Sequence, residues 1–232
     1  MTQKEVEKLI KDFLGLVKKK YSKNLIFVLH HGSWVTGEAK ANSDIDLIIG
    51  LKKIGKKELL VLRKILEQKK FRDFTVLLFS KLDLDNYIPS GRQQFHYGAK
   101  LLYGKCPLPT PTRPELIEEI KEKADLIGFW SKYMFTHKNS FERIVEKLYW
   151  RVKEAVICLK VFVQLKTGRF PLTKNELKEN LDDKKDIELV EILENWEEKK
   201  KDFLKNPDSL MLKTLNFSQR ILENLENQLK KC

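Results

Sequence analysis

The sequence has no long apolar run and no excess of cysteine, and both absences narrow what the chain can be. No apolar segment approaches the roughly 18 residues that a membrane-spanning helix needs. The first residues, MTQKEVEKLIKDF, lack the apolar stretch of a signal peptide. We therefore expect a cytoplasmic protein with no membrane partner.

The three cysteines, Cys106, Cys158 and Cys232, are widely separated. They form no C-x-x-C pair and no even-numbered framework, which argues against both a zinc site and a set of disulfides. Reduced thiols are the expectation.

Acidic residues are scarce in the first half of the chain. Residues 1–109 hold 21 Lys and Arg against 11 Asp and Glu, a net charge of +10, whereas residues 110–232 hold 24 against 22, a net charge of +2. A field of this sign attracts polyanions such as a nucleotide or RNA. A lysine-rich solvated surface is the alternative explanation.

Proline is also rare, except in one segment. Four of the seven prolines fall in PLPTPTRP, residues 107–114, where neither a helix nor a central strand can form. We interpret this segment as a linker between a first domain, 1–106, and a second domain, 115–232.

The first domain alternates between helical and strand-like periodicity. Helices are expected at 2–20, 56–70 and 90–103, and strands at 24–31, 44–51 and 71–80. This alternation predicts an α+β domain, a mixed sheet flanked by helices.

The second domain shows only helical periodicity. One helix is expected from Thr112 to Phe135, and a long one from a cap at Ser140 to Gly168. Two more are expected near 187–205 and 209–230, with Asp186 and Asp208 as caps. Four helices with one apolar face each predict an all-α bundle.

Residues 32–47, GSWVTGEAKANSDIDL, combine glycines and acids after a buried strand. Gly32 tolerates a sharp turn, and Gly37 lets the backbone pass close by. A helix that begins at Ser33 would offer its first N–H groups and the Ser33 hydroxyl to a phosphate. A simple strand-to-helix turn is the alternative.

Asp44 and Asp46 stand two residues apart at the start of the next strand, so their side chains project from one face. Adjacent carboxylates repel each other unless a cation lies between them, and hard oxygen ligands suit Mg²⁺. Two solvated aspartates at an exposed strand end are the alternative.

The order Gly-Ser, three residues, Gly, five residues, Ser-Asp-Ile-Asp-Leu resembles the signature of the DNA polymerase β-like nucleotidyltransferases, especially the minimal and kanamycin nucleotidyltransferase branches. The resemblance implies that Gly32 and Ser33 hold a triphosphate, with Gly37 and Ser43 in the same nucleotide site. It implies that Asp44 and Asp46 bind catalytic Mg²⁺. The second domain resembles the HEPN-like helical bundles that accompany such domains.

The family has a third carboxylate on the following strand, and here its position is ambiguous. Alignment on Ser80 places Thr75 at that position, with Asp73 two residues earlier on the same face. We name Asp73 as the third catalytic residue, with Thr75 as the alternative occupant. The resemblance also suggests that a glutamate of the helical domain acts as base, with Glu142, Glu146 and Glu154 as candidates. Solvated glutamates on the outer face of a helix are the alternative.

The resemblance implies transfer of a nucleoside monophosphate from an NTP, with ATP expected, to an acceptor hydroxyl, with release of pyrophosphate. The acceptor could be a small molecule, a protein hydroxyl or an RNA 3′ end. The alternative is a catalytically weakened nucleotide-binding module that acts as a sensor or antitoxin-like partner. A pure RNA-binding protein would leave the paired aspartates unexplained. The apolar helical stripes are compatible with a homodimer.

Overall fold

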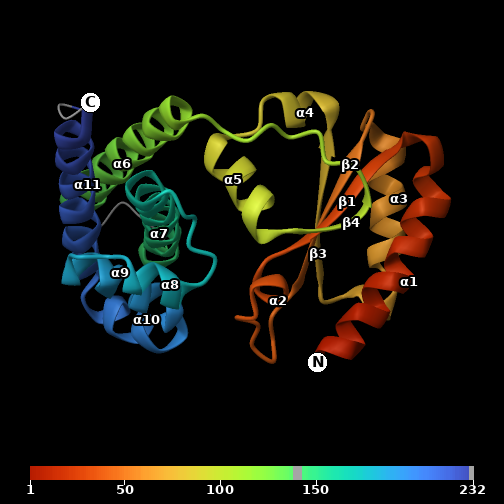
Figure 1. The fold of residues 1–232 in the computed structure, drawn as a ribbon. Helices are drawn as coiled ribbons and strands as arrows, with labels where there is room; N and C mark the ends of the chain where they lie inside the picture. Colours follow the sequence, from red (N-terminus) through yellow and green to blue (C-terminus); the bar gives the residue numbers. More distant parts are fainter. Residues whose placement is uncertain (138–142, 230–232) are drawn as a thin grey trace. The chain divides into compact units, whose positions relative to one another are not determined.

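The computed structural model describes residues 1–137 and 143–229, which form two compact units, Met1–Thr110 and Pro111–Cys232 (Figure 1). The division falls inside the proline-rich segment 107–114. No helix among the described residues is both long and apolar enough to cross a membrane. The predicted fold class, an α+β region followed by an all-helical one, is confirmed.

Four strands form one sheet in the first unit, in the order β3-β2-β1-β4. The strands are β1 (Leu25–His31), β2 (Ile45–Leu51), β3 (Phe74–Ser80) and β4 (Lys100–Gly104). β1 runs antiparallel to β2 and β4, whereas β2 and β3 are parallel. The register pairs His31 with Asp46 and Asp46 with Thr75. These three residues therefore lie in one row across the sheet.

Helices cover both faces of this sheet (Figure 1). They are α1 (Gln3–Tyr21), α2 (Ser33–Thr36), α3 (Lys56–Leu66), α4 (Lys81–Asp85) and α5 (Pro89–Gly98), with short 3₁₀ helices at Ser22–Asn24 and Lys69–Phe71. Alternate residues of β2, such as Leu47 and Ile49, join the core under α1 and α3. Ile48 instead joins a core with Phe95 of α5. Because side chains alternate along a strand, Asp46 lies on the α5 face.

The predicted helix at 90–103 is wrong in its second half. α5 ends at Gly98, Ala99 is extended, and Lys100–Gly104 form β4 on the open edge of β1. Gly104 has φ +73°, and a Cβ there would lie 1.9 Å from the carbonyl oxygen of Ile26. Periodicity alone does not separate a short apolar strand from a helix end, and the free edge of β1 decides the outcome.

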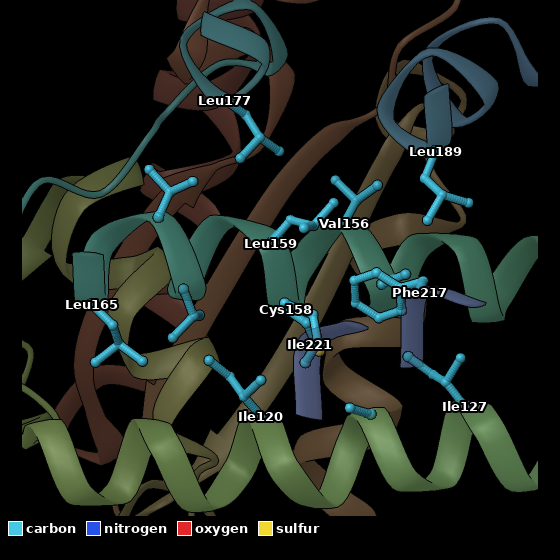
Figure 2. Close-up of a cluster of buried hydrophobic side chains, with 14 of the residues drawn as sticks. Ile120, Ile127, Val156, Cys158, Leu159, Leu165, Leu177, Leu189, Phe217 and Ile221 are labelled. Atoms are coloured by element: carbon cyan, nitrogen blue, oxygen red, sulfur yellow. The ribbon is translucent and has the colours of Figure 1, made fainter. Parts of the chain in front are cut away.

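The second unit is entirely helical in its described residues. Its helices are α6 (Arg113–Thr136), α7 (Ile144–Thr167), α8 (Lys174–Glu179), α9 (Lys184–Glu194), α10 (Trp196–Lys205) and α11 (Pro207–Leu229). Thr112 and Glu115 form a capping box at the start of α6. Figure 2 shows side chains of α6, α7, α8, α9 and α11 converging on one buried cluster, with Leu159 and Phe217 fully buried in it.

Four details of the second unit differ from the prediction. The expected helix 187–205 is two helices that meet at Asn195, and α8 was not predicted. Asp183, not Asp186, caps α9, because Asp186 is buried and pairs with Arg220 of α11. Asp208 lies within the first turn of α11 instead of capping it. Ser140 and Glu142 lie outside the described residues.

Candidate functional site

The turn after β1 brings the backbone of Gly32 against a carboxylate. Gly32 has φ +82°, and a Cβ on it would lie 2.2 Å from Oδ2 of Asp46. Both the left-handed backbone and the close approach require glycine at this position. The predicted turn therefore exists, and it is built directly on one of the two predicted metal ligands.

The helix expected at Ser33 is a single turn of four residues, Ser33–Thr36. The amides of Val35 and Thr36 donate to the carbonyl of Gly32, and Gly37 closes the turn in the left-handed region with φ +79°. Gly32 offers no side-chain cap, so the first amides of the turn receive no capping side chain. A helix this short has a small dipole, and anion binding would depend on its N–H groups and the Ser33 hydroxyl.

Asp44 and Asp46 stand at the start of β2. Asp44 directly precedes the strand and is exposed, whereas Asp46 is its second residue and half-buried. The amide of Ile45, between them, donates to the carbonyl of Asp73 at 2.8 Å, which anchors this end of β2 to β3. Asp46 is thus held within the sheet, and Asp44 lies at the edge of the sheet, just before the strand begins.

Thr75 occupies the place beside this pair. It is the register partner of Asp46, and its hydroxyl donates to Oδ2 of Asp44 at 2.8 Å. Asp73 precedes β3, and its carboxylate pairs with Nε of Arg72 at 3.3 Å. Among the described residues, no three or more His, Cys, Asp or Glu side chains are arranged to hold a metal ion. Asp73 therefore does not complete a three-carboxylate metal site with Asp44 and Asp46 in this structure, and its catalytic role stays a prediction.

The loop between the turn and β2 is held by Ser43. Its hydroxyl accepts a hydrogen bond from the amide of Lys40 at 2.8 Å, and its carbonyl accepts one from the indole Nε1 of Trp34 at 3.2 Å. Ser43 is thus a loop-forming residue in this structure, and its predicted contact with a nucleotide stays a prediction. Through these bonds the loop that carries Asp44 is tied to α2.

Two histidines end β1 on opposite faces of the sheet. His31 lies in the row of Asp46, and its ring centroid is 5.4 Å from that of Phe95. Burial, reinforced by the neighbouring His30, lowers the pKa of His31 to about 4, so its imidazole is neutral at neutral pH. From the sequence, core or edge packing is the expectation for His30 and His31, with ligand contact as the alternative. The place of His31 in the row follows from the β1–β2 register, which only the fold supplies.

The candidate bases of the second unit are engaged within that unit. Glu154 pairs with Arg151 at 2.7 Å, and Glu146 lies 3.8 Å from Arg143. Surface pairs such as the second are weak. The role of either glutamate as a base stays a prediction.

A cavity of about 530 Å³ opens beside Asp44. Its walls include Asn42, Ser43, Arg72, Asp73 and Thr75, so it is mostly polar. The site thus combines a glycine turn, two carboxylates, a threonine and an adjoining polar cavity.

The part of the chain that forms this site is similar in sequence to a known protein family. Residues 15–97, which contain the predicted glycines, serines and aspartates of the site but not the candidate glutamate bases, match the model of the family described as Polymerase beta, Nucleotidyltransferase. Among curated proteins, none matches the sequence significantly.

The fold has a solved counterpart. It is similar to the crystal structure of spectinomycin adenyltransferase AAD(9) from Enterococcus faecialis with ATP and spectinomycin, with a TM-score of 0.53 and 14% sequence identity over 93% of this chain and 98% of that chain. At this identity the likeness concerns the fold, including the order of the two units. Residues 15–97 of the first unit are thus similar to the nucleotidyltransferases of the polymerase β family, and a helical unit follows them in the chain.

Proposed function

We propose that the protein is a Mg²⁺-dependent nucleotidyltransferase that moves a nucleoside monophosphate from an NTP to an acceptor hydroxyl and releases pyrophosphate. The observation that carries the proposal is the contact of the Gly32 backbone with the Asp46 carboxylate. This contact brings a turn that could bind phosphate and a carboxylate that could bind a metal ion into one site. The matched family supports the same reaction class.

Asp44 and Asp46 would hold the metal. Two carboxylates agree with the way Mg²⁺ is usually bound, through one or two protein carboxylates, substrate phosphates and waters. Because Gly32 has no side chain, Oδ2 of Asp46 can lie against the backbone of the turn. When bound, the metal would neutralise charge on the phosphates and on the attacking and leaving oxygens.

The chain's own residues would mainly position the nucleotide. The N–H groups of the Gly32–Ser33 turn and the Ser33 hydroxyl would donate to triphosphate oxygens, with Gly37 closing the turn and Ser43 holding the adjoining loop. Phosphoryl transfer depends chiefly on such positioning and on charge stabilisation. ATP is the nucleotide we propose, since the structural counterpart was crystallised with ATP.

A second function is favoured by one specific contact. Thr75 donates to Asp44 where a third carboxylate would stand, so the described strand β3 offers no carboxylate beside the pair to deprotonate an acceptor. Asp73 could take that part only by leaving Arg72. The alternative is therefore a nucleotide-binding module with weak or absent transfer, acting as a sensor or antitoxin-like partner.

The acceptor is proposed only as a hydroxyl-bearing molecule. The structural counterpart was crystallised with spectinomycin, which places a small polyhydroxylated molecule first among the candidates. The polar cavity beside Asp44 is large enough for such a molecule. A protein hydroxyl and an RNA 3′ end remain the other candidates.

Calorimetric binding of each NTP, with and without Mg²⁺, tests the proposal. We expect Mg²⁺-dependent binding in the wild type that is lost in Asp44→Ala/Asp46→Ala and kept in Asp85→Ala, which removes an exposed aspartate elsewhere in the first unit. Equal binding in the acidic double variant and the control would refute the metal site.

Pyrophosphate release in the same samples then separates the two functions. Release that rises with a hydroxylated acceptor and falls in the double variant supports the transferase. Tight binding without release, in the presence of acceptors of all three classes, supports the sensor. The Asp73→Asn variant reports whether that carboxylate takes part, since only a catalytic role predicts a loss of release with unchanged nucleotide affinity.

A further inference from the structure

A second cavity lies on the other face of the sheet from Asp46, behind the glycine turn. It measures about 380 Å³ and lies between α1, α2 and β4. Its apolar walls include Ile10 and Leu14 of α1, Trp34 and Val35 of α2, and Leu102 of β4. This volume and this apolar lining are typical of small-molecule sites.

The buried end of this cavity holds an imidazole without a partner. His30 is only 4% exposed, and its Nε2 is buried with no hydrogen-bond partner among the described residues. Nearly all buried polar groups in folded proteins are paired, so an unpaired one needs an explanation. Burial, and secondarily the charge of Lys100, lowers the pKa of His30, so that one ring nitrogen can donate and the other can accept.

Two ammonium groups also line the cavity. Lys11 and Lys100 are exposed, and neither forms an ion pair within the part of the chain that the structure describes. Glu7 is the one acidic side chain lining the cavity, and it accepts a hydrogen bond from Gln3 at 3.3 Å. The lining therefore carries one net positive charge beside an apolar chamber, which matches a monoanion with an apolar body.

We propose that this cavity binds a small apolar monocarboxylate, with its body against Trp34 and Leu102 and its carboxylate near Lys11, Lys100 and the unpaired His30. One net positive charge favours a carboxylate over a phosphate ester, which carries about two negative charges at neutral pH. The occupant would contact α2, whose first residue follows Gly32 directly.

Trp34 links this cavity to the other face of the sheet. Its ring lines the cavity, while its indole Nε1 donates to the carbonyl of Ser43, the residue before Asp44. An occupant that shifts the indole therefore changes a hydrogen bond beside a predicted metal ligand. The structure thus assigns to the cavity an effector role exerted through the loop of residues 38–43.

The test uses the full chain and NMR, with 2-naphthoate as the probe and neutral 2-naphthamide as its matched control. We expect saturable shifts of the Trp34 indole signal with naphthoate, and an affinity at least about tenfold lower for naphthamide. In Lys11→Gln/Lys100→Gln the naphthoate Kd should rise about tenfold or more. The control Lys8→Gln/Lys23→Gln, which removes two exposed lysines that do not line the cavity, should change it less than about twofold.

The Trp34→Phe variant tests the link. It keeps an aromatic wall but removes the indole donor, so naphthoate should still bind and yet no longer shift the amide signals of Ser43 and Asp44. Equal binding of naphthoate and naphthamide, no saturable binding, or equal losses in both lysine pairs would overturn the site. Persistence of the Asp44 shift in Trp34→Phe would overturn the link. Since no nucleotide is used, these outcomes are independent of the proposed transferase.

Discussion

At the residue scale, Gly32 is required for two reasons, its positive φ and its close approach to the Asp46 carboxylate. Gly32→Ala should destabilise the protein by about 1–3 kcal/mol, because φ +82° with ψ −164° is a conformation that almost only glycine adopts, and should also push the Asp46 carboxylate aside. Gly37→Ala has a similar φ of +79° but open space around the new Cβ. We expect both variants to lower the urea midpoint, and only Gly32→Ala to abolish Mg²⁺-dependent ATP binding. Retention of full ATP affinity in Gly32→Ala would contradict the site's geometry.

Thr75 provides a gain-of-function prediction. Thr75→Asp places a third carboxylate beside Asp44 and Asp46, and should raise Mn²⁺ affinity about tenfold, measured by calorimetry. Thr75→Val keeps the shape but loses the hydroxyl that donates to Asp44, and should leave metal affinity within about threefold of the wild type. If the aspartate variant bound metal no better than the valine variant, Thr75 would not occupy the third carboxylate position.

His31 predicts a dependence of stability on pH. Its folded pKa of about 4 lies below its ordinary value of 6.5, so the unfolded chain binds the proton more tightly. The contribution of His31 to stability is complete above pH 6.5 and is lost as the pH falls toward 4, at most about 3 kcal/mol. Urea unfolding between pH 7 and 4 should therefore show a shallower loss in His31→Gln than in the wild type. The matched variant of the exposed His96, His96→Gln, should retain the wild-type slope.

The sequence predicts some of these residues and not others, for physical reasons. Asp44 and Asp46 are visible because their spacing and their place after a turn are local features. The sequence leaves Thr75 and Asp73 as alternatives for the third position, since the strand register decides which of them lies beside Asp44 and Asp46. For His31 the sequence predicts only packing at the end of a buried strand or contact with a ligand, because its row with Asp46 depends on residues distant in the chain.

At the scale of elements, the pairing of β1 with β2 requires a glycine at position 50, for a reason that only the tertiary structure shows. Phe27 pairs with Gly50 across the ladder, and a Cβ on Gly50 would lie 2.1 Å from the buried Phe27 ring. Gly50→Ala should therefore cost about 2–3 kcal/mol, since overpacking forces side chains off their rotamers. Gly15→Ala, in the exposed middle of α1 with open space, should instead stabilise by about 0.5–1 kcal/mol. Thermal unfolding of the two variants checks both signs.

Helices were predicted correctly where the helical periodicity of the sequence is long. Prediction failed for β4, where pairing with a neighbouring strand determines the structure. α1 and α6 follow from sustained periodicity and capping boxes at Thr2 and Thr112. β4 exists because β1 offers an unpaired edge, which cannot be detected within a short window of sequence. α9 and α10 are divided at Asn195 although both helices contact α7 and α11.

At the scale of the whole molecule, charge is divided unequally between the two units. The first carries a net +10, and a triphosphate is attracted to it over distances comparable to the Debye length. If the proposed function holds, ATP affinity should fall roughly threefold to tenfold between 50 and 500 mM NaCl. Uncharged adenosine, titrated as a control, should show little change. An ATP affinity insensitive to salt would assign binding to local contacts alone.

The order of the strands also has a consequence for the newly made chain. β1 and β2 pair across the short segment that holds Gly32 and Asp44, so both halves of the candidate site can meet once residue 51 has emerged from the ribosome. The other edge of β1 receives no partner until residues 100–104 emerge. During translation this buried strand presents unpaired N–H and C=O groups to other chains, a recognised route to aggregation. β4 therefore covers the exposed edge of β1 only after the strands that carry the candidate site have paired.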